Sequence, residues 1–128
     1  MDRALKSGLL LLRFILVLHT LVLLMLAGLA GEFLSGTDGV VKFHEYAAFA
    51  ALAICFLQTG AAAAAQRSGN VSLWLLIGTI LVLLAEGLQI GTGFGRFLRV
   101  HIPLGVIVFG VVLVQTISVF RPAREMNR

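Results

Sequence analysis

Four long apolar runs separated by short polar segments dominate the chain. They cover about residues 8–33, 43–65, 72–91 and 97–120. A helix that crosses a bilayer needs roughly 20 mostly apolar residues, and each run reaches that length. The segments between the runs are rich in glycine and small polar residues, as turns are. The pattern predicts an all-α integral membrane protein, a four-helix transmembrane bundle in one domain over residues 1–128.

Composition supports a membrane protein. Hydrophobic residues make up 59% of the chain and charged residues 12%, whereas soluble domains carry about 25% charged residues. The mean hydropathy is +1.03, which leaves too little polar surface for a water-soluble globule. The net charge of +4 does not indicate nucleic-acid binding, because the basic residues lie at the ends of the apolar runs.

The basic residues also predict an orientation. Four spans place both termini and the middle loop on one side of the membrane. Seven basic residues fall on that side: Arg3, Lys6, Arg13, Arg67, Arg121, Arg124 and Arg128. Three fall on the other side: Lys42, Arg96 and Arg99. The positive-inside rule therefore predicts a multi-pass protein of the bacterial inner (cytoplasmic) membrane with both termini in the cytoplasm.

The chain contains an internal repeat. His44 follows a cation by two residues and precedes Gln58 by fourteen, and His101 has the same relation to Arg99 and Gln115. A second match, TLVLLMLAG at 20–28 and TILVLLAEG at 79–87, lies in the first and third runs. The repeat predicts two duplicated helical hairpins with the same orientation. The second helix should then lie opposite the fourth, and the first opposite the third.

This symmetry places His44 and His101 at one depth, facing each other across the bundle. Neutral imidazole is a good iron ligand, and bundle cores often hold cofactors. The pair therefore predicts one haem b with two histidine ligands. The cations near the haem propionates would be Lys42, Arg96 and Arg99. The small residues that leave a gap for the macrocycle would be Gly28, Gly87 and Gly105.

Other readings of the pair stay open. Small residues at these spacings also let membrane helices pack closely without a ligand. The two histidines would also suit another metal, a quinone or a proton relay, or they are structural.

Five more polar residues fall inside the apolar runs. Glu86 is an intramembrane acid, which by default is a functional candidate for proton handling or for a quinone contact. Gln89 lies close to it in sequence, and His19 has no counterpart in the repeat because Gly78 takes its place. Gln58 and Gln115 should face the interior about 21 Å from their histidines, where an interhelical hydrogen bond or the polar end of a quinone pocket is expected. Cys55, the single cysteine, is expected to be a small buried residue.

With the duplicated hairpin and His44 and His101 in view, the chain resembles two groups. One is a family of small bacterial four-helix membrane proteins of uncharacterised function. The other is the small membrane b-type cytochromes, including the cytochrome b561-like proteins, in which histidines on transmembrane helices hold haem. The second resemblance implies electron transfer. Cytochromes with two haems need four histidines, and this chain has three, so one haem is the most it supports.

The sequence thus favours a membrane b-type cytochrome, or a cytochrome-like electron-transfer subunit rather than a stand-alone enzyme. The lipid bilayer is its environment, and quinone or a partner redox subunit would exchange electrons with it. Whether it forms a homo-oligomer stays open. The alternative is a non-redox structural or accessory subunit of a membrane complex, and a small carrier ranks last.

Overall fold

The computed structural model describes residues 2–121, with side chains described from Ser7 onward. It contains four α-helices: α1 (Asp2–Leu34), α2 (Val40–Arg67), α3 (Leu73–Phe94) and α4 (Leu98–Phe120). α1 and α2 cover their predicted spans and extend past them at both ends. α3 begins one residue late and extends past its predicted end, and α4 begins one residue late and ends at the predicted residue. Four residues used above lie outside the described side chains: Arg3, Lys6, Arg124 and Arg128.

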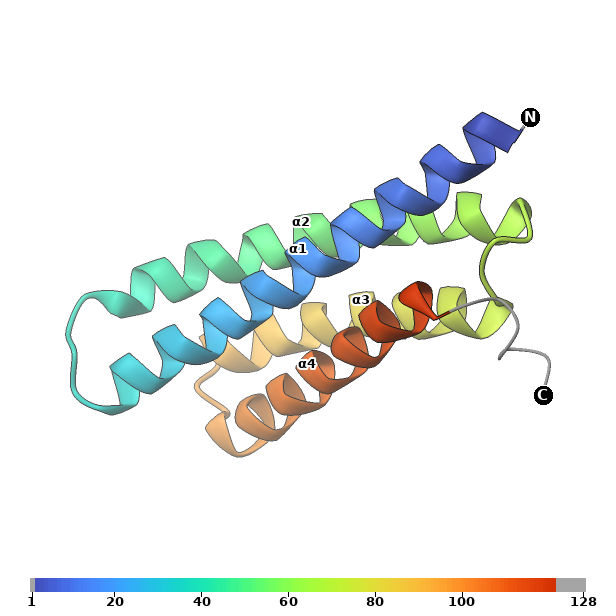
Figure 1. The fold of residues 1–128 in the computed structure, drawn as a ribbon. Coiled ribbons are helices and arrows are strands. Elements are labelled where there is room, and N and C mark those ends of the chain that lie inside the picture. The colour runs from blue at the N-terminus through green and yellow to red at the C-terminus, as the bar shows by residue number, and fades with distance from the viewer. Residues whose placement is uncertain (1, 122–128) are drawn as a thin grey trace.

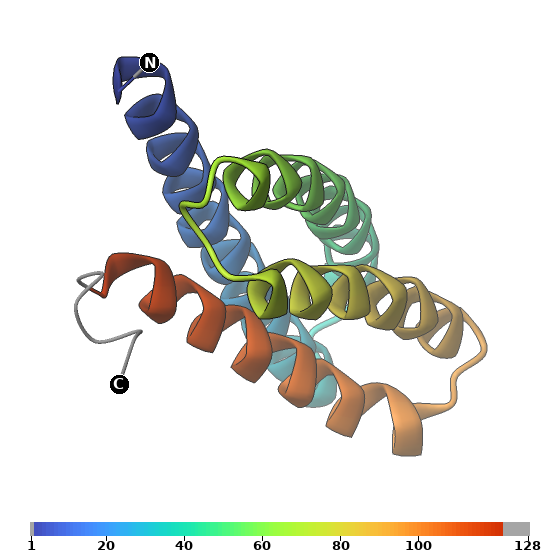
Figure 2. The same cartoon turned by 90° about the vertical axis from the view of Figure 1, so that its right-hand side faces the viewer.

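The helices form a closed ring of antiparallel neighbours (Figures 1 and 2). Each helix packs on the next one in the chain, and α4 closes the ring against α1. The diagonal pairs, α1 with α3 and α2 with α4, make no close backbone contact over the described residues. The expected placement of the second helix opposite the fourth is therefore confirmed. Two of the connections lie at one end of the bundle, and the described chain ends lie at the other (Figure 1).

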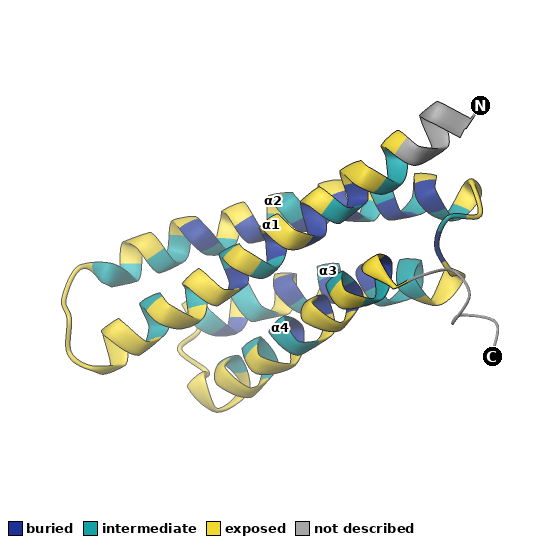
Figure 3. Cartoon of the chain, viewed as in Figure 1, coloured by how far each residue is buried: buried dark blue, intermediate teal, exposed yellow. Residues whose placement is uncertain are grey.

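All four helices are long and apolar enough to cross a membrane. Figure 3 shows that most of the exposed positions lie on the outer faces of the helices and that the buried positions face inward. Large apolar side chains such as Phe14, Phe56, Leu84 and Val106 are exposed there. A continuous apolar exterior of this kind suits a lipid environment, because water would not solvate it.

Small residues on one face of α2 allow its neighbours to approach. Its buried side chains recur every three or four residues, the period of one helix face. They are Ala47, Ala51, Cys55, Gln58, Ala62 and Ala65. Two apolar core clusters form around this face, one around Leu12, Leu16 and Ala62 and one around Leu23, Cys55 and Val108. Small interfacial residues are the usual basis of close helix packing in membranes, where van der Waals contact replaces the hydrophobic effect.

Polar contacts fasten α1 to α4 and close the ring. Arg13 donates from Nε to the carbonyl oxygen of Val119 at 2.9 Å, and its guanidinium lies 5.2 Å from the centre of the Phe120 ring. A cation at the end of a helix satisfies a carbonyl that has no partner within the helix. Further along, the hydroxyls of Thr20 and Thr116 lie 2.8 Å apart. These contacts hold the first and last helices together.

Ala62 offers a test of this packing. Its side chain is fully buried, whereas Ala64 on the same helix is exposed. We expect Ala62→Leu to lower the free energy of unfolding by about 1–3 kcal/mol, because the added atoms have no space in a packed core. Ala64→Leu is the matched control and should change it by less than about 0.5 kcal/mol. Reversible unfolding in mixed detergent micelles measures both, and equal effects would contradict the arrangement of α2.

Candidate functional site

The four helices each contribute one polar side chain to a hydrogen-bonded network in the core. His19 of α1 lies with Nε2 2.6 Å from Oε1 of Glu86 on α3 and with Nδ1 2.7 Å from Oε1 of Gln58 on α2. Gln58 donates from Nε2 to Oε1 of Gln115 on α4 at 3.1 Å. His19 and Gln58 are fully buried, and Glu86 and Gln115 are nearly so. The network therefore joins all four helices at one level.

The hydrogen bonds define the protons in this network. The amide oxygen of Gln58 can only accept, so Nδ1 of His19 carries a hydrogen. One further proton lies between Nε2 of His19 and the Glu86 carboxyl group. The pair is net neutral whether that proton is on the imidazole or on the carboxyl. A neutral pair is much less costly to bury in a membrane than an isolated charge.

The network explains how the repeat is broken at His19. In the first hairpin His19 bonds to Gln58. In the second hairpin Gly78 stands at the matching position, and a Cβ there would lie 2.8 Å from Nε2 of Gln115. The absent side chain thus makes room for the second glutamine. An interhelical hydrogen bond, one of the two roles expected for the glutamines, is present between Gln58 and Gln115. The partnership of His19 with Glu86 was not predicted, because the repeat does not relate these two residues.

Cys55 lies beside this network, although the sequence predicted for it only the role of a small buried residue. One potential ligand atom each from His19, Cys55 and Glu86 lies within 4.8 Å of the others. The second carboxyl oxygen of Glu86, Oε2, is buried without a hydrogen-bond partner. The sequence signal that could have placed Cys55 beside the network is its spacing from Gln58. Cys55 precedes Gln58 by three residues and so shares its helix face.

His44 and His101 meet near the end of the bundle that carries the α1–α2 and α3–α4 connections, which we call the histidine level. Their ring centroids lie 6.1 Å apart, with 57° between the ring planes. They come from α2 and α4, which lie diagonally across the ring. The structure therefore brings together the two histidines that the repeat placed opposite each other.

A backbone carbonyl fixes each of these imidazoles. Nδ1 of His44 donates to the carbonyl oxygen of Leu26 at 3.1 Å, and Nδ1 of His101 donates to that of Gln89 at 2.9 Å. Because a carbonyl only accepts, the hydrogen of each neutral ring is on Nδ1 and the lone pair is on Nε2. This is the arrangement that metal-ligating histidines use, with the second ring nitrogen held by an outer acceptor.

The two hairpins hold their histidines at different registers. An offset of 59 relates the first helix to the third in the sequence, so the carbonyl matching that of Gln89 would belong to Ala30. His44 instead reaches Leu26, about one helical turn deeper. The repeat is therefore approximate at the level of these contacts.

The glycines expected beside the histidines lie elsewhere. Gly28 and Gly87 are exposed, and a Cβ on either would meet nothing within 4 Å. Gly105 does face the interior, but its space is taken by Gln89, whose Nε2 would lie 2.8 Å from a Cβ there. The glycine that accommodates a histidine is Gly93, where a Cβ would lie 2.9 Å from Cε1 of His101. The periodicity misassigned these glycines because it did not give the rotation of each helix.

Two more sets of predicted residues can be placed. Lys42, Arg96 and Arg99 are exposed, and all three lie close in sequence to the histidine level. Gln89 donates from Nε2 to the carbonyl oxygen of His101 at 2.8 Å, while its Oε1 is buried without a partner. Gln89 thus belongs with the histidine pair, although it lies only three residues from Glu86 in the sequence.

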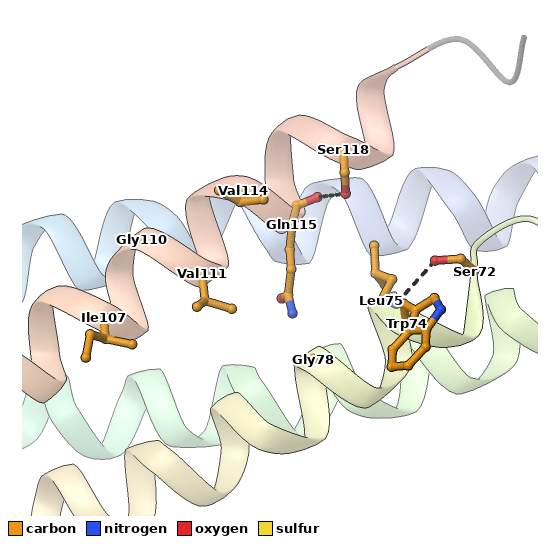
Figure 4. Close-up of a pocket in the computed structure, with 10 residues that line it drawn as sticks. All are labelled: Ser72, Trp74, Leu75, Gly78, Ile107, Gly110, Val111, Val114, Gln115 and Ser118. Carbon is orange, nitrogen blue, oxygen red and sulfur yellow. Dashed lines mark hydrogen bonds between the residues drawn. The ribbon is translucent and has the colours of Figure 1, made fainter. Parts of the chain in front are cut away.

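A groove runs between α3 and α4 on the outer surface (Figure 4). It is a shallow, open groove of about 690 Å³ with a mostly apolar lining that includes Ile107, Val111 and Val114. The Gln115 side chain extends across it towards Gly78, and Trp74 lies on its α3 side. Gln115 is therefore the member of the polar network that also lines this groove.

Comparison of the chain with protein-family models, with curated proteins and with solved structures finds no match.

The His19–Glu86 contact gives a testable expectation for stability. Glu86→Leu and His19→Leu should each lower the free energy of unfolding by about 1–3 kcal/mol, because each leaves a buried partner unsatisfied. The double variant should lose less than the sum, with a coupling energy of at least about 0.6 kcal/mol, the average for such bonds in membranes.

The control is Glu32→Leu, at an exposed position of α1, which should change stability by less than about 0.5 kcal/mol. Additive effects of the two core substitutions in a detergent unfolding titration would show that the contact contributes nothing.

Proposed function

We propose that this protein is a b-type cytochrome-like electron-transfer protein of a bacterial inner membrane, with one haem b held between His44 and His101. The observation that carries the proposal is the state of the two imidazoles, which face each other with Nδ1 hydrogen-bonded and Nε2 left as a lone pair. The ring centroids lie 6.1 Å apart, so the two imidazoles are close enough to hold one metal-bearing cofactor between them.

The packing around the pair supports a cofactor at this level. The buried members of both apolar core clusters lie further along the bundle, although the partly buried Leu26 and Leu104 near the histidines pack against one of them. The nearest buried apolar side chain of α2 is that of Ala47. No buried apolar cluster occupies the histidine level within the described residues. Lys42, Arg96 and Arg99 supply cations near this end for the haem propionates. Haem contributes one-electron chemistry when bound, while the chain supplies the ligands and fixes their orientation.

The distribution of basic residues supports an orientation with both termini in the cytoplasm. The histidine level would then lie towards the non-cytoplasmic surface and the His19 network deeper in the membrane. One haem does not span the bilayer, so a second carrier is needed on the other side. A partner redox subunit, another copy of this chain or a quinone fills that role.

The α3–α4 groove is the place where a quinone would meet the polar network. His19 and Glu86 are enclosed in the core, so they do not contact a membrane-soluble molecule directly. The amide of Gln115 lines the groove and accepts from Gln58 inside the bundle. A quinone carbonyl would accept a hydrogen bond from Nε2 of Gln115, and the apolar groove walls would hold its ring and tail.

Visible spectroscopy of the purified protein, expressed with haem available, tests the proposal. We expect a reduced b-type spectrum with one haem per chain, and its loss in His44→Ala and in His101→Ala, since each removes an axial ligand. Tyr46→Ala is the control, because Tyr46 is exposed on the same helix as His44 and its loss should leave the spectrum unchanged. A well-folded, colourless wild-type protein would refute the haem and favour the structural-subunit alternative.

Gly93 gives a finer test on the same site. Gly93→Ala places a methyl group against the His101 ring, so the ring must move and we expect haem affinity to fall by roughly 10- to 100-fold, as when the support of a ligand is lost. Gly91→Ala is matched, because a Cβ there meets nothing within 4 Å, and its affinity should stay at the wild-type value. Haem titration of the apoprotein measures both, and equal affinities would mean that His101 is not held as described.

A further inference from the structure

We propose that the core carries a second, separate metal site, made by His19, Cys55 and Glu86, which takes a zinc ion or a similar borderline divalent transition metal. The three ligand atoms lie within 4.8 Å of one another, and the three side chains come from α1, α2 and α3. A tetrahedral zinc site with ligands at about 2.0–2.3 Å has ligand atoms roughly 3.5 Å apart. Metal binding would require the Nε2–Oε1 distance between His19 and Glu86, now 2.6 Å, to lengthen towards that spacing.

The unpartnered oxygen of Glu86 is an independent sign of a missing ligand. Glu86 is only 4% exposed, yet its Oε2 has no hydrogen-bond partner. A buried polar atom without a partner is costly, and native structures rarely leave one unexplained. A metal ion bound to the Glu86 carboxylate would satisfy it.

The support of His19 fits a metal ligand. Nδ1 of His19 donates to Gln58, so Nε2 is the atom that faces Glu86. Gln58 in turn bonds to Gln115, and this fixes the amide that orients the imidazole. Metal-bound histidines commonly have such an outer hydrogen bond, which sets the tautomer and the ring orientation.

Charge balance favours a divalent ion in this apolar setting. A neutral imidazole, a thiolate and a carboxylate together compensate the two charges of zinc. Without metal, a proton shared by His19 and Glu86 and the thiol proton of Cys55 also leave the group neutral. Binding therefore exchanges one Zn²⁺ for two protons with no net charge buried in either state.

The donor set indicates the class of metal. A thiolate prefers softer ions, a carboxylate harder ones, and imidazole suits zinc and its neighbours. One nitrogen, one sulfur and one oxygen from three residues leave a fourth position open, as in zinc sites with three protein ligands. This site shares no ligand with the histidine pair, so the proposal is independent of the proposed function.

Metal binding to the full-length protein in detergent tests the inference. We expect one zinc ion per chain after dialysis against zinc, and a thiolate-to-cobalt charge-transfer band when cobalt(II) is the probe. Cys55→Ala should abolish the band and lower zinc affinity at least tenfold, and it should fold normally because Cys55 packs as a small apolar residue. His19→Gln and Glu86→Gln should lower the affinity similarly, with folding checked by circular dichroism.

The control distinguishes the two metal sites. His101→Ala should leave the cobalt band and the zinc stoichiometry unchanged, while Cys55→Ala should leave the haem spectrum unchanged. Zinc binding that survives in Cys55→Ala and disappears in His101→Ala would place the ion at the histidine pair and overturn the inference. No bound metal in the wild-type protein, or a cobalt spectrum without the thiolate band, would overturn it as well.

Discussion

The bundle depends on one requirement, that polar side chains inside an apolar structure find partners inside it. His19, Gln58, Glu86 and Gln115 meet that requirement through a single chain of hydrogen bonds, apart from Oε2 of Glu86, which has no partner. Each residue belongs to a different helix, so the complete network forms only when all four helices are in register. Such bonds are individually modest in membranes, about 0.6 kcal/mol each. Their effect is to specify one rotation and one depth for every helix.

The same network accounts for the departure from twofold symmetry. A perfect duplication would place two histidines or two glycines beside the two glutamines. The chain instead has His19 beside Gln58 and Gly78 beside Gln115. A second histidine in place of Gly78 would occupy the space that the Gln115 side chain needs. The first hairpin thus supplies His19 to the network, and the second supplies Gln115, which lines the α3–α4 groove.

Two candidate sites lie along the bundle at different depths and have different chemistry. His44 and His101 are held by backbone carbonyls and offer two equivalent nitrogen ligands, which suits an axial pair. His19, Cys55 and Glu86 offer three different ligand atoms, which suits a small ion. An apolar core layer that includes Leu23, Ala51 and Val108 belongs to the segment between Gln58 and the histidine pair. The two sites can therefore be tested separately.

The amino-acid sequence was sufficient to predict the four helices and the meeting of His44 with His101. Helix length follows from apolar runs, and the facing of His44 and His101 follows from a repeat that forces equal positions to equal depths. It also predicted that Gln58 and Gln115 face the interior, since fourteen residues return to nearly the same helix face, but it did not predict that they bond to each other. All three predictions rest on periodic patterns, which can be read from a single sequence.

Only the tertiary structure decided which residues meet across helices without a symmetry relation. Three contacts depend on how each helix is rotated and shifted against its neighbours. They are the bond of His19 to Glu86, the position of Cys55 beside that pair and the bond of Gln89 to His101. That rotation also decided that Gly28 and Gly87 face outward while Gly93 makes room for an imidazole. Rotation and shift are set by the summed packing of all four helices, so no single run of the sequence determines them.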